Sequence, residues 1–65
     1  MSNLKRIREE SKLKQAQLAE LSGVNIRMIQ HYEQGRKDIN NASALTVYKL
    51  SAALNCKVED ILELQ

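Results

Sequence analysis

The sequence of 65 residues contains no proline, two glycines, one cysteine and only 3% aromatic residues. β-Sandwiches and β-barrels need many turns and strands rich in β-branched and aromatic residues, so this composition excludes them. A lone cysteine excludes an internal disulfide. One histidine and one cysteine are too few for a zinc site with four His or Cys ligands. We therefore expect so short a chain to be stabilised by tight helix packing or by a dimer.

Long apolar stretches are also missing. No run approaches the roughly 20 residues of a membrane span, and the first residues lack the apolar core of a signal peptide. A single thiol is typical of a reducing compartment. We expect a cytoplasmic protein with one domain over residues 1–65, because a second hydrophobic core would need more residues.

Leu, Ala, Glu, Lys, Gln and Arg, which favour helices, make up much of the chain. Their periodicity predicts an all-α protein with five helices, at about 2–11, 15–22, 25–34, from residue 40 or 41 to 54, and 58–64. The expected N-caps are Ser2 or Asn3, Asn25, and Asn40 or Asn41. The second, third and fourth helices should end at residues that tolerate a left-handed backbone, namely Gly23, Gly35 and Asn55.

Apolar residues at helical spacing define the expected core. It comprises Leu4, Ile7, Leu13, Leu18, Ala19, Leu21, Val24, Ile29, Tyr32, Ile39, Val47, Leu50, Leu54, Val58, Ile61 and Leu62. Tyr48 is expected in the core with its hydroxyl at the edge, and Cys56 as a small buried apolar residue. Leu64 and other exposed apolar groups near the Ile39 loop could form a two-fold interface, or the C-terminal end could fray.

The segment 15–34, QAQLAELSGVNIRMIQHYEQ, predicts two short helices that meet at a tight turn. Ala19 provides the small side chain that two closely crossing helices require, and Gly23 provides the positive φ of the turn. The outward residues of the second helix are Ile26, Arg27, Gln30, His31 and Gln34, with Met28 at the boundary. Such a face matches the chemistry that is needed at base edges in the major groove of DNA.

The stretches LKRIREESKLKQAQLAELSGV, Tyr-Glu-Gln-Gly at 32–35 and CKVEDIL resemble the phage-repressor/Cro-like, or XRE-type, helix-turn-helix family. The resemblance covers nearly the whole chain. It implies a compact five-helix, lambda-repressor-like domain with the helix-turn-helix at helices two and three. It also implies a partner, double-stranded operator DNA, that is bound by a homodimer to regulate transcription, with repression as the expected outcome.

The resemblance also implies roles for individual residues. The residues that would contact bases are Ile26, Arg27, Met28 and His31. Those that would contact the DNA backbone are Gln15, Asn25, Arg36 and Lys37. Arg8 and Glu33 occupy the positions of a structural ion pair between the first and third helices. The alternative is plain solvation for Arg27, His31, Arg36 and Lys37, and partial burial in the core for Ile26 and Met28. Arg8 could also reach a phosphate while it pairs with Glu33.

Two departures from the family pattern concern individual positions. Ile26 stands where a polar, base-reading residue is common, and Lys57 replaces the usual Ser or Thr cap of the last helix. The third departure is the small excess of positive charge. Residues 1–40 carry eight Lys/Arg against five Asp/Glu, and residues 41–65 carry two against three.

These departures leave a rival function open, a protein-interaction module such as an antitoxin-like partner with weak or secondary DNA binding. No motif indicates an enzyme, a cofactor, a metal site or a small-molecule effector.

Overall fold

The computed structural model describes residues 2–64, and every regular element in that range is a helix. The elements are α1 (Asn3–Glu10), α2 (Gln15–Ser22), α3 (Ile26–Gln34), the 3₁₀ turn η1 (Ile39–Asn41), α4 (Ala44–Leu54) and α5 (Val58–Ile61). The prediction of an all-α, five-helix fold is confirmed. Between residues 2 and 64, no helix has the length and apolar character that crossing a membrane requires.

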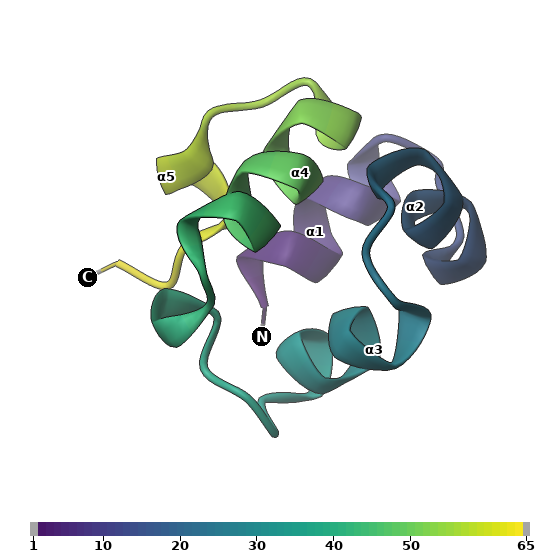
Figure 1. Ribbon diagram of the computed structural model, residues 1–65. Coiled ribbons are helices and arrows are strands. Elements are labelled where there is room, and N and C mark those ends of the chain that lie inside the picture. Colours follow the sequence, from purple (N-terminus) through teal and green to yellow (C-terminus); the bar gives the residue numbers. More distant parts are fainter. Residues whose placement is uncertain (1, 65) are drawn as a thin grey trace.

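The five α-helices close a ring of contacts in the order α2, α4, α5, α1, α3 and back to α2 (Figure 1). Each helix contributes one fully enclosed side chain to the centre of this ring. These side chains are Leu4, Leu18, Ile29, Leu50 and Ile61. Because the core draws on every helix, it fixes the position of α3 relative to the other four.

The predicted caps at both ends of α3 are confirmed. The Oδ1 of Asn25 accepts a hydrogen bond of 2.7 Å from the backbone N–H of Arg27. Gly35 ends the helix with a φ of 77°, and Gly23 ends α2 with a φ of 74°. The sequence therefore sets the length of α3 through local chemistry at its two ends.

The expected cap of α4 at Asn40 or Asn41 is wrong. Ser43 caps this helix, since its Oγ accepts a bond of 3.1 Å from the backbone N–H of Thr46. Asn40 and Asn41 instead belong to η1, where Asp38 accepts a bond of 2.9 Å from the N–H of Asn40. A serine directly before the helix has the better geometry for capping it.

The predicted fifth helix is too long, because α5 ends at Ile61 and the chain continues extended at Leu62. Asn40 Nδ2 donates to the carbonyl oxygen of Glu63 at 3.1 Å, and Asn40 Oδ1 accepts from the N–H of Glu63 at 2.9 Å. Asn3 Nδ2 donates to the carbonyl oxygen of Leu62 at 2.8 Å. Residues 62 and 63 are therefore tied to both α1 and η1, and the alternative of a frayed end does not hold for them.

Three residues that were expected inside lie at the surface: Leu21 and Tyr48 are each 62% exposed, and Val58 is 37% exposed. On α2, Leu18 and Ser22 occupy the inward positions. Leu21 directly precedes Ser22, so its side chain projects about 100° away from that of Ser22. Tyr48 follows the buried Val47 on α4 and is displaced by the same angle.

Candidate nucleic-acid interface

The turn between α2 and α3 is built from short local contacts. The N–H of Gly23 donates to the carbonyl oxygen of Ala19 at 2.9 Å, which closes the last turn of α2. The Oγ of buried Ser22 accepts from the N–H of Val24 at 3.1 Å, and Val24 lies in the core. The two helices therefore leave the turn in fixed directions, as a helix-turn-helix requires.

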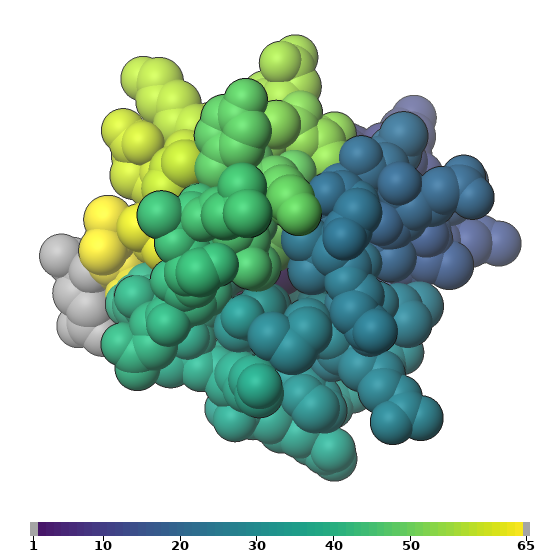
Figure 2. All heavy atoms as spheres, viewed as in Figure 1, coloured from purple at the N-terminus to yellow at the C-terminus, as the bar shows by residue number. Residues whose placement is uncertain are grey.

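The outward face of α3 lies at the surface of the molecule (Figure 2). Ile29 and Tyr32 point inward, whereas Arg27 and Gln34 are exposed, and Gln30 and His31 are half-buried beside them. An α-helix with its side chains is about 10–12 Å in diameter, so α3 fits the roughly 12 Å width of the DNA major groove. This polar face can donate and accept hydrogen bonds at base edges.

Ile26 and Met28, both predicted to contact bases, lie half-buried at the margins of this face. Met28 also packs against the core, and its Sδ lies 3.8 Å from the Nζ of Lys37. Lys37 and its neighbour Arg36 are exposed beyond the C-terminal end of α3. The four side chains thus frame the polar face.

Asn25 has one polar atom left after it caps α3. Its Oδ1 is bonded to Arg27 N–H, whereas the N–H groups of Nδ2 on this exposed side chain form no hydrogen bond within residues 2–64 and can donate to a ligand. Phosphate oxygens are acceptors, and donors are therefore the groups that this position needs for a contact with the DNA backbone.

Arg8 and Glu33, which were expected to pair, meet in the structure. Arg8 Nε and Nη2 donate to the two carboxylate oxygens of Glu33 at 2.7 and 3.0 Å, and Nη1 donates to the carbonyl oxygen of Leu13 at 2.7 Å. The side chains are only 10% and 2% exposed. The hydrogen bond to Glu33 raises the pKa of Arg8, against the opposing effect of burial.

Sequence reasoning left Gln30 without a role, although it placed the residue on the outward face. In the structure Gln15 Nε2 donates to Glu33 Oε1 at 3.0 Å, and Gln30 Nε2 donates to Gln15 Oε1 at 3.4 Å. Gln15, expected to touch a phosphate, is thus engaged by α3 at both ends of its amide. The family resemblance implies that Gln15 steadies the recognition helix, but it identifies neither Glu33 nor Gln30 as the partner, because the relative position of the two helices is set by the core.

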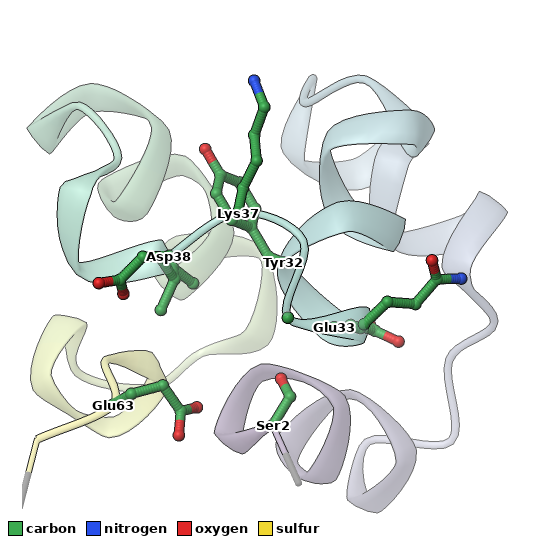
Figure 3. A pocket seen from close by; sticks show the side chains of 9 residues that line it. Ser2, Tyr32, Glu33, Lys37, Asp38 and Glu63 are labelled. Atoms are coloured by element: carbon green, nitrogen blue, oxygen red, sulfur yellow. The ribbon is translucent and has the colours of Figure 1, made fainter.

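A hollow lies near the C-terminal end of α3 (Figure 3), with a volume of about 310 Å³. Ser2, Asp38 and Glu63 line it together with residues of α3 and the loop that follows. Its carboxylates oppose a phosphate, so this hollow is unsuited to the DNA backbone. Within residues 2–64, no group of His, Cys, Asp and Glu side chains could hold a metal ion.

The comparison with known families agrees with this geometry. The sequence model of the helix-turn-helix family matches residues 4–61, a range that begins in α1 and ends with the last residue of α5. No curated protein matches the chain.

Proposed function

Because this chain belongs to the phage-repressor/Cro-like, XRE-type helix-turn-helix family of DNA-binding regulators, we propose that it binds specific double-stranded DNA sites and represses transcription there. In this proposal α3 enters the major groove, and the bound protein blocks access of the polymerase. The single observation that carries the proposal is the uncovered polar face of α3, framed by exposed cations.

We assign sequence reading to Arg27 and His31, with Ile26 and Met28 at the margins available for apolar contact with thymine methyl groups. Arg27 is the exposed cation of the face, and an arginine bonded to guanine by two N–H groups is the commonest specific contact.

Binding to phosphates is assigned to the N–H groups of Asn25, to Arg36 and Lys37, and to the start of α2 at Gln15. Arg36 and Lys37 directly follow α3 and are exposed, so they can reach the strands that flank the groove. The side chain of Gln15 is bonded to Glu33 and Gln30, which leaves the backbone N–H at the start of α2 as its group for a phosphate.

We further propose a homodimer. A nine-residue helix reads only a few base pairs, too few for a unique genomic site, so two subunits on half-sites about 10 bp apart are required. Val58 and Leu64 remain exposed at the C-terminal corner and are the apolar groups there that a second copy could cover.

The test exposes the protein to a random pool of duplex DNA near physiological salt, followed by sequencing of the retained duplexes. Enrichment of an inverted repeat supports a dimeric sequence reader. The affinity for the enriched site should fall as the salt concentration rises. Each substitution that removes a cationic contact with a phosphate should reduce the slope of log affinity against log salt by about 1. Arg36→Ala and Lys37→Ala test this, with Lys49→Ala on α4 as the control.

A second candidate is a protein-interaction module of the antitoxin type. Leu45 and Tyr48 favour it, because these large apolar side chains are 61% and 62% exposed one turn apart on α4. If the pool yields no retained DNA, the leading proposal fails and this candidate takes its place.

A further inference from the structure

Met28 and Lys37 meet at the edge of the polar face of α3. The thioether sulfur Sδ of Met28 lies 3.8 Å from the ammonium nitrogen Nζ of Lys37, and this contact is exposed. Met28 is half-buried, because its side chain also packs against the core. A thioether is only a weak hydrogen-bond acceptor, so the contact leaves the ammonium group available for a stronger acceptor.

Both side chains line a hollow of about 430 Å³ between the end of α3 and the start of α4. The hollow is open to solvent, so a small dissolved molecule can reach the sulfur. Lys37 is the one cation among the residues that line it, and Ser43 already donates its O–H to Oγ1 of Thr46 at 2.9 Å. A new acceptor on the sulfur of Met28 would therefore find its strongest donor in Lys37.

No carboxylate holds the ammonium group of Lys37. Its side chain extends away from the carboxylates of Asp38 and Glu63 (Figure 3), and within residues 2–64 it forms no ion pair. In the unmodified protein its charge is therefore available for a DNA phosphate, which is the role proposed for it.

Hydrogen peroxide converts a methionine to the sulfoxide. The sulfur gives up two electrons and binds one oxygen, the O–O bond of the peroxide breaks, and the other oxygen leaves with both protons as water. The product is polar, whereas the thioether is not. Since Sδ and Nζ are 3.8 Å apart, an oxygen added to Sδ on the side of Lys37 lies within hydrogen-bonding distance of the ammonium group.

Cys56 is a less favourable target for the same oxidant. Its thiol is half-buried, and burial, with a smaller effect of Asp60, raises its pKa. Peroxides react with the thiolate, which is therefore scarce in the folded protein at neutral pH. Oxidation of the thioether needs no deprotonation, so Met28 is the sulfur through which an oxidant can act on the DNA interface.

We propose that Met28 is a redox-sensitive modification site, which a hydroperoxide oxidises to a sulfoxide that binds Lys37 and withdraws it from the DNA phosphate. Methionine sulfoxide reductases reverse the step, with a dithiol that becomes a disulfide while the oxygen leaves as water. The inference rests on the proposed function, since it takes Lys37 as a phosphate contact.

The test uses Cys56→Ala, which removes the competing thiol, and compares the protein before and after treatment with hydrogen peroxide. Oxidation should reduce the slope of log affinity against log salt for the enriched DNA site by about 1. The same change corresponds to about sevenfold weaker binding at about 0.15 M salt. Reductases for both sulfoxide epimers should restore the slope, and peptide mass spectrometry locates the added oxygen at Met28.

Two further variants in the Cys56→Ala background isolate the contact. Met28→Leu has no sulfur at this position, so peroxide should leave its own slope unchanged. Lys37→Ala should show no further reduction of the slope on oxidation, because the phosphate contact is already absent. Thermal unfolding before and after treatment verifies that each protein is folded.

A second readout needs no DNA. After oxidation, an N-hydroxysuccinimide ester should acetylate the amine of Lys37 more slowly, because the sulfoxide oxygen holds the ammonium form. Lys49 on α4 is the control and should react at the same rate before and after oxidation.

Four results overturn the inference while the proposed function stands. Met28 stays unoxidised in the folded protein, its oxidation leaves the slope unchanged, peroxide reduces the slope equally in Met28→Leu or Lys37→Ala, or oxidation unfolds the protein. An unchanged acetylation rate at Lys37 overturns the contact between sulfoxide and lysine. If the native protein enriches no DNA sequence, the proposed function itself fails and the effect on DNA binding falls with it.

Discussion

Arg8 on α1 holds Glu33 on α3 through two hydrogen bonds of 2.7 and 3.0 Å, and both side chains are nearly buried. Because a buried charge without its partner is costly, Glu33→Ala should lower the free energy of unfolding by about 3–5 kcal/mol, measured by urea denaturation. Glu33→Gln should be less damaging, since its amide oxygen can still accept one bond from Arg8.

The matched control is the exposed pair of Arg6 and Glu10, whose N–O distance is 3.3 Å and whose side chains are 49% and 63% exposed. Arg6→Ala should change the free energy of unfolding by no more than about 0.5 kcal/mol. If Arg6→Ala and Glu33→Ala lowered the free energy of unfolding equally, burial would not explain the contribution of the Arg8–Glu33 pair to stability.

Gly23 is required for its backbone conformation and not for space. Its φ is 74°, and no neighbouring atom lies within 4 Å of the position that a Cβ would occupy. Gly23→Ala should therefore lower the free energy of unfolding by about 1–2 kcal/mol through the strained backbone alone. Gly23→Asn should cost less, because asparagine tolerates positive φ. A greater loss for Asn than for Ala in thermal unfolding would show that steric contact matters instead.

Asn40 anchors the extended C-terminal segment through two bonds to the backbone of Glu63, at 3.1 and 2.9 Å. Asn40→Ala should lower the free energy of unfolding by about 1–2 kcal/mol and accelerate hydrogen exchange at the Glu63 amide. Asn41→Ala, at an exposed neighbour, is the control. Unchanged exchange at Glu63 in Asn40→Ala would show that other contacts hold the segment.

Arg27 is the exposed cation of the proposed reading face. Arg27→Ala should weaken binding to the selected DNA site by about 1–3 kcal/mol and relax the preference at one base pair. Binding titrations against the site and its single-base variants measure both effects. Lys49→Ala, which removes an equal charge from α4, is the control, and unchanged affinity and preference in Arg27→Ala would remove the residue from the interface.

Burial, and to a smaller extent Asp60, raises the pKa of the half-buried Cys56 thiol. The folded protein therefore keeps the neutral thiol at a pH where the unfolded chain already ionises. Iodoacetamide should react with the folded protein more slowly than with the urea-unfolded chain at pH 8, because the thiolate is the nucleophile. As the pH rises above the ordinary thiol pKa, the free energy of unfolding should fall more in the native protein than in Cys56→Ala.

Local chemistry made much of the fold predictable. The Asn25 cap and the glycines at 23 and 35 act within a few residues of the helix ends they define, and the sequence is enough to identify them. Helical spacing likewise identified the buried stripe of α3, because Ile29 and Tyr32 are the apolar residues that lie on one side of it.

Contacts between distant segments could not be predicted from the residues alone, and the Arg8–Glu33 pair was expected only through the family resemblance. Asn40 carries the sequence signal of a helix cap, yet its amide matches the backbone of a segment 23 residues away. The bond between Gln15 and Gln30 depends equally on how α2 and α3 cross. Helical spacing also wrongly predicted that Leu21 and Tyr48 are buried. In the sequence, an apolar residue next to the buried stripe of a helix cannot be distinguished from one within it.

The residues that hold α3 in place are distinct from most of those it displays. Ile29, Tyr32 and Glu33 fix the helix, whereas Arg27 and His31 support no other element through hydrogen bonds of their side chains within residues 2–64. Side chains at these two positions can therefore be exchanged at little cost to folding. Evolution or protein design can therefore change the DNA sequence that the protein prefers by substituting these residues, while the core that holds α3 stays the same.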